Sequence, residues 1–320
     1  MVNFHHMQSD NPRIVVITGA NSGIGKSAAF QFAGEGYTVV MACRNLERSR
    51  PVLDSVKQAS KNDAVHLMEL DTSSFASIRT FSEQLRNRFP KLDILINNAA
   101  YFDHGAAYRL SPDNIELTFA TNVVGPFLLT MLLKEHLQES DDARVLNASS
   151  NITKHFYSPK KEIDFDTLTG PVNEQKKFSV YTAYCNSKMA LVMLTFRLAE
   201  VLKESAITVN ALQINGARMS PETLKKFKWY WRIVAGVQNL FFPPAEYMAG
   251  RYFELCTADQ YKRVTGTLFN DKGEIMEAAP ENAGIQYTFR NTHYPSYAER
   301  TDIRDRIWSF CSEHTALSVT

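Results

Sequence analysis

The fold of this chain is decided by one stretch, Arg13-Ile14-Val15-Val16-Ile17-Thr18-Gly19-Ala20-Asn21-Ser22-Gly23-Ile24-Gly25. Its β-branched start predicts a short buried strand, and the glycines that follow predict a tight turn. A helix-like run, Ser27–Ala33, then leaves the turn. A strand, a glycine turn and a helix in this order bring backbone N–H groups and the positive end of a helix onto a pyrophosphate. The stretch therefore predicts a dinucleotide site, although its spacing is G-x-x-x-G-x-G and not the commoner G-x-G-x-x-G.

Strand-like and helix-like segments alternate over the first two-thirds of the chain. The expected strands are Arg13–Thr18, Tyr37–Cys43, Ala64–Leu70, Leu92–Ile96, Arg144–Ala148, Ile207–Ile214 and, late in the chain, Gly266–Phe269. The expected helices are Gly23–Gly34, Leu46–Ser60, Ser74–Phe89, a long one over Ser111–Leu137, and Tyr181–Leu202. This alternation predicts an α/β, doubly wound Rossmann fold with a mostly parallel sheet of seven strands and right-handed crossovers.

The last third of the chain is less regular. We expect helices over Tyr247–Cys256 and Ala298–His314, and an extended loop over Pro280–Pro295. The aromatic stretch Phe227–Pro244 lies within residues 221–262, which we expect to form a substrate lid or wall; packing, a subunit contact or a membrane-surface contact is the alternative. Because no Gly/Ser linker or repeat interrupts the sequence, we expect one domain over residues 1–320 with a flexible tail at 1–11.

Composition narrows the classes of function. The chain has 320 residues, 44% of them hydrophobic and 22% charged, which is typical of a globular protein. A net charge of +1 gives no reason to expect a nucleic-acid partner. The four cysteines form no C-x-x-C pair, so we expect reduced thiols and no metal site. Residues 1–11 lack the apolar core of a signal peptide, and Val123–Leu133 is too short to span a membrane, so we expect a cytoplasmic protein without an integral span.

Arg44 follows the second expected strand, where an acidic residue would hold the ribose 2′-hydroxyl of NAD. A guanidinium at this place suits a 2′-phosphate, because it binds phosphate oxygens in a fork. The sequence therefore favours NADP over NAD, a solvated surface arginine being the alternative. Asp71 follows the third expected strand and would accept from an adenine amino group or cap the next helix.

Tyr184 and Lys188 lie four residues apart in an expected helix and so share one face. A phenol is a poor base at neutral pH, and a nearby ammonium lowers its pKa. Such a pair can give or take a proton at an alcohol/carbonyl couple, although many helical pairs of this kind are structural. A hydroxyl at Ser149 or Ser150 would hold the substrate oxygen, a serine-rich turn satisfied by the backbone being the alternative. Asn122 would cap a helix kink or serve a water chain to Lys188.

Together these residues resemble the short-chain dehydrogenase/reductase family. The matching pieces are Thr18-Gly19-x-x-x-Gly23-x-Gly25, Asn97-Asn98-Ala99-Ala100, Asn122, Ser150 and Tyr184-x-x-x-Lys188, in family order over about Arg13 to Ser220. Four further segments resemble its branch of retinol dehydrogenases and the WW-domain oxidoreductase: Met41-Ala42-Cys43-Arg44, Leu70-Asp71, the long insert between Ser150 and Tyr184, and Val264–Phe269.

The resemblance implies a role for each matching residue. Tyr184 would be the general acid/base, Lys188 would lower its pKa and bind the nicotinamide ribose, Ser150 would steady the substrate oxygen, and Asn122 would hold a relay water. The residues expected to bind the cofactor are Gly19, Asn21, Ser22, Gly23, Ile24, Gly25, Arg44, Asp71, Thr72, Asn98, Ala99, Asn122, Tyr184, Lys188, Asn215, Gly216 and Ser220.

The sequence also departs from the family pattern. Asn215 replaces a usual proline before Gly216, and Ser220 stands where a threonine would touch the nicotinamide amide. Because proline fixes φ, its absence predicts a less rigid loop. The family implies dimers or tetramers through the long helices, which the extended C-terminal region would oppose.

The leading hypothesis is an NADP(H)-dependent oxidoreductase that interconverts an alcohol and a carbonyl, or reduces an enone, on a fairly apolar small molecule. A non-catalytic nucleotide sensor or scaffold on the same fold is one alternative, since a fold does not imply an activity. A secondary-metabolite reductase of narrow specificity is the other.

Overall fold

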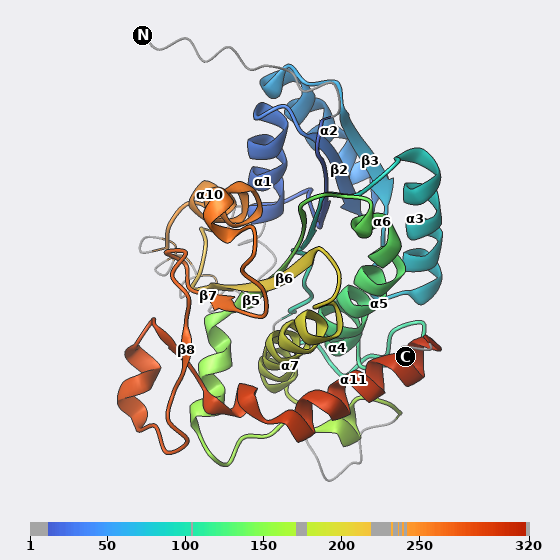
Figure 1. Cartoon of the computed structure of the whole chain (residues 1–320). Helices are drawn as coiled ribbons and strands as arrows, with labels where there is room; N and C mark the ends of the chain where they lie inside the picture. Colours follow the sequence, from blue (N-terminus) through green and yellow to red (C-terminus); the bar gives the residue numbers. More distant parts are fainter. Residues whose placement is uncertain are drawn as a thin grey trace.

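Seven parallel strands form the central sheet in the order β3-β2-β1-β4-β5-β6-β7 (Figure 1). The computed structural model describes residues 12–103, 105–170, 178–218, 232, 236, 239 and 242–317. The strands are β1 (Ile14–Thr18), β2 (Thr38–Cys43), β3 (Val65–Glu69), β4 (Ile94–Asn97), β5 (Ala143–Ser150), β6 (Ile207–Ile214) and β7 (Leu268–Phe269). The predicted doubly wound fold is confirmed. The order reverses between β1 and β4, and such a switch point leaves a crevice at the carboxyl ends of the strands.

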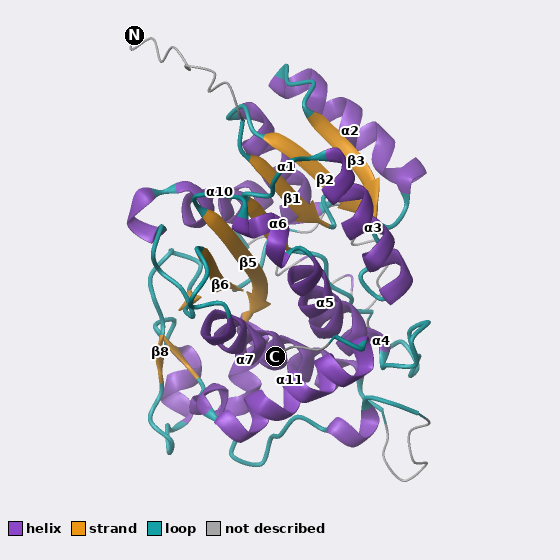
Figure 2. Cartoon of the chain, turned by 45° about the vertical axis from the view of Figure 1, so that its right-hand side comes forward, coloured by secondary structure: helices purple, strands orange, loops and turns teal. Residues whose placement is uncertain are grey.

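Helices cover both faces of the sheet, as Figures 1 and 2 show. Val15 and Ile17 of β1 pack on one face, with α1 (Gly23–Gly34), α2 (Leu46–Ser60) and α10 (Ala245–Thr257). Ile14 and Val16 pack on the other face, with α3 (Phe75–Arg88), α5 (Gly125–Leu132), α7 (Val180–Val201) and α11 (Thr301–Thr315). Because strand side chains alternate between faces, a continuous β-branched run fills both cores.

The long helix expected over Ser111–Leu137 is broken into pieces, so that prediction was wrong. The helical part is α4 (Leu117–Phe119), a π-helical turn (Ala120–Val124), α5 and α6 (Lys134–Gln138). It begins at Glu116, whose carboxylate accepts hydrogen bonds from the backbone of Thr118 (2.9 Å) and Phe119 (2.8 Å). Ser111 lies before this helix, and its backbone N–H donates to Ile115 O (2.7 Å) in a turn.

The segment expected as an extended loop over Pro280–Pro295 also contains regular structure. It holds a 3₁₀ helix (Ile285–Phe289) and β9 (His293–Tyr294), which pairs with β8 (Glu277–Ala278) in a small second sheet. The insert between Ser150 and Tyr184 forms two further 3₁₀ helices, Asn151–Tyr157 and Phe165–Thr167. These short elements depend on contacts with distant parts of the chain, which local sequence patterns do not reveal.

Several other expectations concern the periphery of the molecule. The tail at 1–11, Ser220 and most of the aromatic stretch Phe227–Pro244 lie outside the described residues. The four cysteines are buried and unpaired: Cys43, Cys185, Cys256 and Cys311. No helix within the described ranges is long and apolar enough to cross a membrane.

Gly125 allows α5 to pass against the loop after β3, which supplies a stability test. A Cβ added at Gly125 would overlap the carbonyl oxygen of Thr72. We expect Gly125→Ala to lower the free energy of unfolding by at least about 2 kcal/mol, because the obstructing atom is backbone. The control is Gly250→Ala in α10, where nothing lies within 4 Å, and which should stabilise by about 1 kcal/mol. Denaturant unfolding measures both, and equal effects would contradict the packing argument.

Candidate active site

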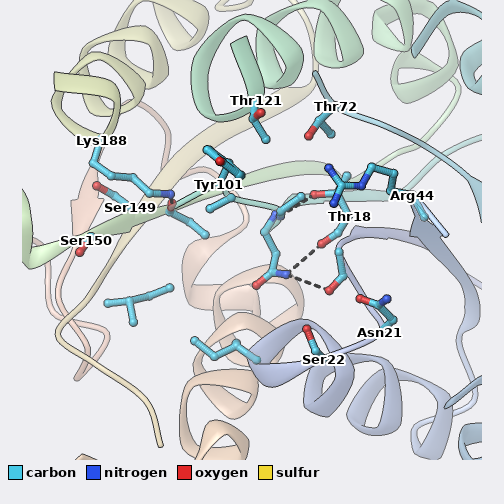
Figure 3. A pocket seen from close by; sticks show the side chains of 18 of the residues that line it. Thr18, Asn21, Ser22, Arg44, Thr72, Tyr101, Thr121, Ser149, Ser150 and Lys188 are labelled. Carbon is cyan, nitrogen blue, oxygen red and sulfur yellow. Dashed lines mark hydrogen bonds between the residues drawn. The ribbon is translucent and has the colours of Figure 1, made fainter. Parts of the chain in front are cut away.

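A cavity of about 710 Å³ lies along the carboxyl edge of the sheet. Figure 3 shows Arg44 and Lys188 at its opposite ends, with Thr18 and Ser22 between them. The predicted residues that line it are Gly19, Asn21, Ser22, Ile24, Arg44, Asp71, Thr72, Asn98, Ala99, Ser150, Tyr184, Lys188, Asn215 and Gly216. Three further predicted residues lie behind the lining residues and do not reach the cavity: Gly23, Gly25 and Asn122. The fold thus gathers most of the predicted residues around one space.

The glycine turn needs its glycines for two different reasons. Gly19 (φ +67°) and Gly23 (φ +54°) adopt left-handed backbone conformations that L side chains rarely take. Gly25 is a close approach, because an added Cβ would lie 2.5 Å from Asn98 Nδ2 and 2.6 Å from Gly19 O. The turn therefore delivers the first residues of α1 to the cavity without side chains in the way.

The N-terminus of α1 lies open to an anion. Ser22 is its N-cap residue, but the Ser22 side chain makes no capping hydrogen bond, and the first turn contains no acidic residue. Ser22 and Ile24 line the cavity. A helix end with unpaired N–H groups and no nearby carboxylate attracts negative charge. This end fits a pyrophosphate.

Asn98 fastens the glycine turn to the end of β4. Its Nδ2 donates to Thr18 O (2.9 Å), and its Oδ1 accepts from the Tyr252 hydroxyl (3.1 Å). The Thr18 hydroxyl accepts in return from the backbone N–H groups of Asn98 and Ala99, both at 2.9 Å. Figure 3 draws hydrogen bonds at Thr18 as dashed lines. Asn98 therefore ties the ends of β1 and β4 together.

Two guanidinium groups line the end of the cavity beyond β2. Arg44 and Arg48 are both exposed there. Asn45 caps α2 between them by accepting from the backbone N–H of Arg48 (2.9 Å). The sequence analysis missed Arg48, although its position four residues after Arg44 at a helix start was a usable signal. This end of the cavity carries two positive charges.

Asp71 lines the same end but does not cap α3. The α3 cap is Ser74, whose hydroxyl accepts from the backbone N–H of Ser77 (3.4 Å). Asp71 Oδ1 instead accepts from the backbone N–H (2.9 Å) and the hydroxyl (2.7 Å) of Ser73. The capping alternative was therefore wrong, and these bonds hold the Asp71 carboxylate against its own loop beside the cavity.

Tyr184, Ser150 and Lys188 meet at the opposite end, beyond β5. Lys188 is buried, and its Nζ donates to Ala148 O (2.7 Å) and lies 5.7 Å from the centre of the Tyr184 ring. The Ser150 side chain lies close enough to the Tyr184 phenol to affect its pKa. The other face of this end is aromatic, since the rings of Phe102 and Tyr184 stack with centres 4.4 Å apart.

Burial governs the titration of this pair. It raises the pKa of Tyr184 to about 12, although the neighbouring Ser150 side chain opposes the shift. Burial also lowers the pKa of Lys188 to about 8. The shift at Tyr184 is opposite to the one expected beside an ammonium, because withdrawal from water disfavours the charged form of both groups. In the ligand-free protein the phenol is thus firmly protonated.

Asn122 lies in the π-helical turn, and its side chain bonds to two other segments. Its Oδ1 accepts from Tyr101 N (2.7 Å), and its Nδ2 donates to Tyr101 O (3.1 Å) and to the Ser187 hydroxyl (3.0 Å). Ser187 in turn donates to Tyr184 O (2.9 Å). The side chain therefore links the loop after β4 to the turn of α7 that carries Tyr184.

The loop after β6 closes this end of the cavity at Asn215 and Gly216. Asn215 O accepts from Asn151 Nδ2 (3.2 Å). Gly216 has a φ of +153°, and an added Cβ would lie 2.6 Å from the ring of Phe242. Ser149 lines the cavity next to Ser150, and its buried hydroxyl has no hydrogen-bond partner among the described residues.

Comparison with known proteins places the chain in a family. The short chain dehydrogenase profile matches residues 13–159. Retinol dehydrogenase 13 of Homo sapiens is 32% identical over 266 residues, which cover 76% of this chain and 76% of that protein. The chain belongs to the short-chain dehydrogenase family. Retinol dehydrogenase 12 of Mus musculus is 34% identical, with 81% of this chain and 78% of that protein covered. The WW domain-containing oxidoreductase of Gallus gallus is 29% identical, with 83% of this chain and 63% of that protein covered. Both support the retinol-dehydrogenase-like branch.

Solved structures share the fold of this short-chain dehydrogenase. An uncharacterised protein from Mycobacterium paratuberculosis superposes with a TM-score of 0.67 at 23% identity, and 96% of each chain is covered. A short chain dehydrogenase from Shigella flexneri, crystallised with NADP, gives 0.62 at 22% identity over 82% of this chain and 98% of that one. Members of the family are oxidoreductases that use a nicotinamide cofactor, and the open α1 terminus and the glycine cradle fit such a group.

The buried lysine of this dehydrogenase makes its stability depend on pH. The ordinary pKa of 10.5 falls to about 8 on folding, so between these values the unfolded chain holds a proton that the folded chain has lost. The free energy of unfolding of the wild type must then rise with pH across this window, by about 3 kcal/mol more than that of Lys188→Met. Denaturant unfolding of the ligand-free protein from pH 7.5 to 10.5 measures the difference. The control is Lys203→Met, at an exposed lysine. The burial argument is contradicted if the stability difference between wild type and Lys188→Met varies with pH no more than the difference between wild type and Lys203→Met.

Proposed function

We propose that the protein is an NADP(H)-dependent oxidoreductase that interconverts an alcohol and a carbonyl on an apolar small molecule. One observation carries the proposal: a phenol, a hydroxyl and a buried amine meet at one end of a cavity whose other end holds two guanidinium groups. The anion-ready end of α1 lies between them. This is the arrangement that an extended dinucleotide with a reactive ring at one end and a 2′-phosphate at the other requires.

The preference for NADP rests on charge at the exit of β2. Arg44 and Arg48 line the cavity there. Binding of NAD would need a carboxylate at this strand exit, and the residues present are Arg44 and Asn45. Two guanidinium groups suit a dianionic phosphate, which they bind through paired N–H donors. Asp71 lies on the neighbouring loop, where its carboxylate would accept from the adenine amino group.

The chemistry at the other end divides between the cofactor and the protein. When bound, the nicotinamide supplies or takes the hydride. Tyr184 supplies the proton to a carbonyl oxygen, or takes it from an alcohol, and Ser150 holds that oxygen beside the phenol. Lys188, held on Ala148 O, would bind the nicotinamide ribose. Asn122 fixes the turn of α7 on which the phenol stands.

The protonation state of the resting site suits reduction. A phenol whose pKa is raised to about 12 is fully protonated at neutral pH and is ready to donate. Oxidation would need the phenolate, which burial disfavours.

The substrate class follows from the aromatic wall. Phe102 stacks on Tyr184 and is 36% exposed, so it borders the place where a substrate carbon must lie. Similarity to proteins named retinol dehydrogenases supports an apolar aldehyde, ketone or alcohol.

Removal of one hydroxyl tests the catalytic assignment. We expect Tyr184→Phe to lower kcat for reduction of apolar aldehydes, retinal among them, by about 10²-fold or more, because the proton donor is lost. NADPH affinity, measured by fluorescence titration, should change little. Tyr181→Phe, one helical turn earlier and 45% exposed, is the control and should keep its activity. A Tyr184→Phe variant with full turnover would refute the assignment, and a wild type that binds NADPH but turns over none of the panel would favour the sensor or scaffold function.

Charge reversal tests the cofactor preference. The wild type should bind NADPH at least about tenfold more tightly than NADH, since each charge-assisted phosphate contact contributes on the order of 1.5–3 kcal/mol. Arg44→Asp should abolish or reverse that ratio. Arg50→Asp, in α2 and outside the cavity lining, makes the same charge change and should leave the ratio intact. A wild type that prefers NADH contradicts the argument from Arg44.

A further inference from the structure

The loop that closes the catalytic end of the cavity is held by a chain of amide side chains. Asn215 Nδ2 donates to Asn291 Oδ1 (3.0 Å), and Gln213 Nε2 donates both to that oxygen (3.2 Å) and to Asn215 Oδ1 (3.1 Å). Asn291 Nδ2 donates in turn to Asp271 Oδ1 (2.6 Å). A residue from the last part of the chain thus reaches the turn after β6.

Sheet topology brings these distant residues together. β6 and β7 are parallel neighbours, so the loops that leave them, at Asn215 and at Asp271, start at the same edge. Asn291 lies just before β9 and spans the two loops. Its backbone oxygen accepts from the fully buried Asn270 (3.1 Å), which fixes the place from which its side chain reaches.

The carboxylate determines which way the amides point. A carboxylate accepts hydrogen bonds and donates none, so Asp271 requires Asn291 to turn its NH₂ group toward it. The Asn291 oxygen then faces the loop after β6 and accepts from Asn215. This order of donors and acceptors gives the Asn215 side chain one orientation. The charge on Asp271 makes the first bond of the chain its strongest.

The turn itself supplies little restraint. Gly216 follows Asn215 with a φ of +153°, in a region open to glycine alone, and glycine has the freest backbone of any residue. The absence of a proline at 215 led us to expect a less rigid loop. In the folded chain Asn215 is instead bonded through its side chain to Gln213 and Asn291, and through its carbonyl to Asn151.

We propose that Asn291 and Asp271 are positioning residues that set the 215–216 turn and thereby the affinity for the nicotinamide half of the cofactor. The proposal rests on the proposed function. It requires that the pair act only at the catalytic end of the cavity, which Asn215 and Gly216 line together with Tyr184. The far end, at Arg44, must be insensitive to it.

A swap of donor and acceptor tests the proposal. Asn291→Asp places two carboxylates where a hydrogen bond of 2.6 Å stood, and we expect the dissociation constant for NADPH to rise about tenfold. Adding Asp271→Asn restores a donor facing an acceptor with the same net charge, and leaves an oxygen for Asn215. The double variant should therefore return to within about threefold of the wild type. Fluorescence titration with NADPH measures all three proteins.

A second ligand and a control variant separate positioning from general destabilisation. Adenosine 2′,5′-bisphosphate reaches only the Arg44 end, so its affinity should not change in Asn291→Asp. Thr292→Asp adds a carboxylate at the exposed neighbouring residue and should bind NADPH like the wild type. The proposal is overturned if Asn291→Asp binds NADPH normally, if it loses both ligands equally, or if the swap rescues nothing. A wild type that binds no NADPH overturns the proposed cofactor itself and this proposal with it.

Discussion

A glycine turn fastened to the neighbouring strand is the constraint on which the rest of the site depends. Asn98 and Thr18 exchange hydrogen bonds across the ends of β1 and β4, at the point where the strand order reverses. Gly25 packs so closely on Asn98 and the Gly19 carbonyl that no side chain fits at this position in the first turn of α1. The crevice, the open helix end and the exits of the other strands all take their places from this junction, because parallel strands share one carboxyl edge.

Withdrawal from water is the second organising effect. It raises the pKa of the Tyr184 phenol and lowers that of Lys188 to about 8, so at neutral pH the site holds a neutral phenol beside an amine that is still mostly protonated. Behind it, buried polar groups satisfy one another: Asn97 donates to Asn147 (2.8 Å), which donates to Thr195 (2.9 Å) between β4, β5 and α7. These bonds offset the cost of withdrawing the amides from water, while Asn97 Oδ1 and the Ser149 hydroxyl have no hydrogen-bond partner among the described residues.

The last third of the chain completes a cavity that the first two-thirds begin. The family profile ends at residue 159, yet Tyr252 of α10 supports Asn98, and Phe242 packs on Gly216. The amide of Asn291 adds a third contact, at Asn215. A segment that is irregular in sequence thus sets the boundary at the catalytic end, where members of one family can differ while the sheet stays the same.

Local patterns in the chain were enough to predict the seven-stranded parallel sheet, the dinucleotide turn and the shared helix face of Tyr184 and Lys188. Strand alternation, glycine turns and helical periodicity are all properties of residues close together in sequence. The sequence pointed to a kink at Asn122 but did not reveal the π-helical turn there, in which Asn122 bonds to the backbone of the distant Tyr101, or the late start of the helix at Leu117. Nor did it reveal the raised pKa of Tyr184 or the partner of Asn215. Those were decided by tertiary structure alone, because burial and hydrogen bonding depend on what the fold brings alongside a residue and not on its neighbours in sequence.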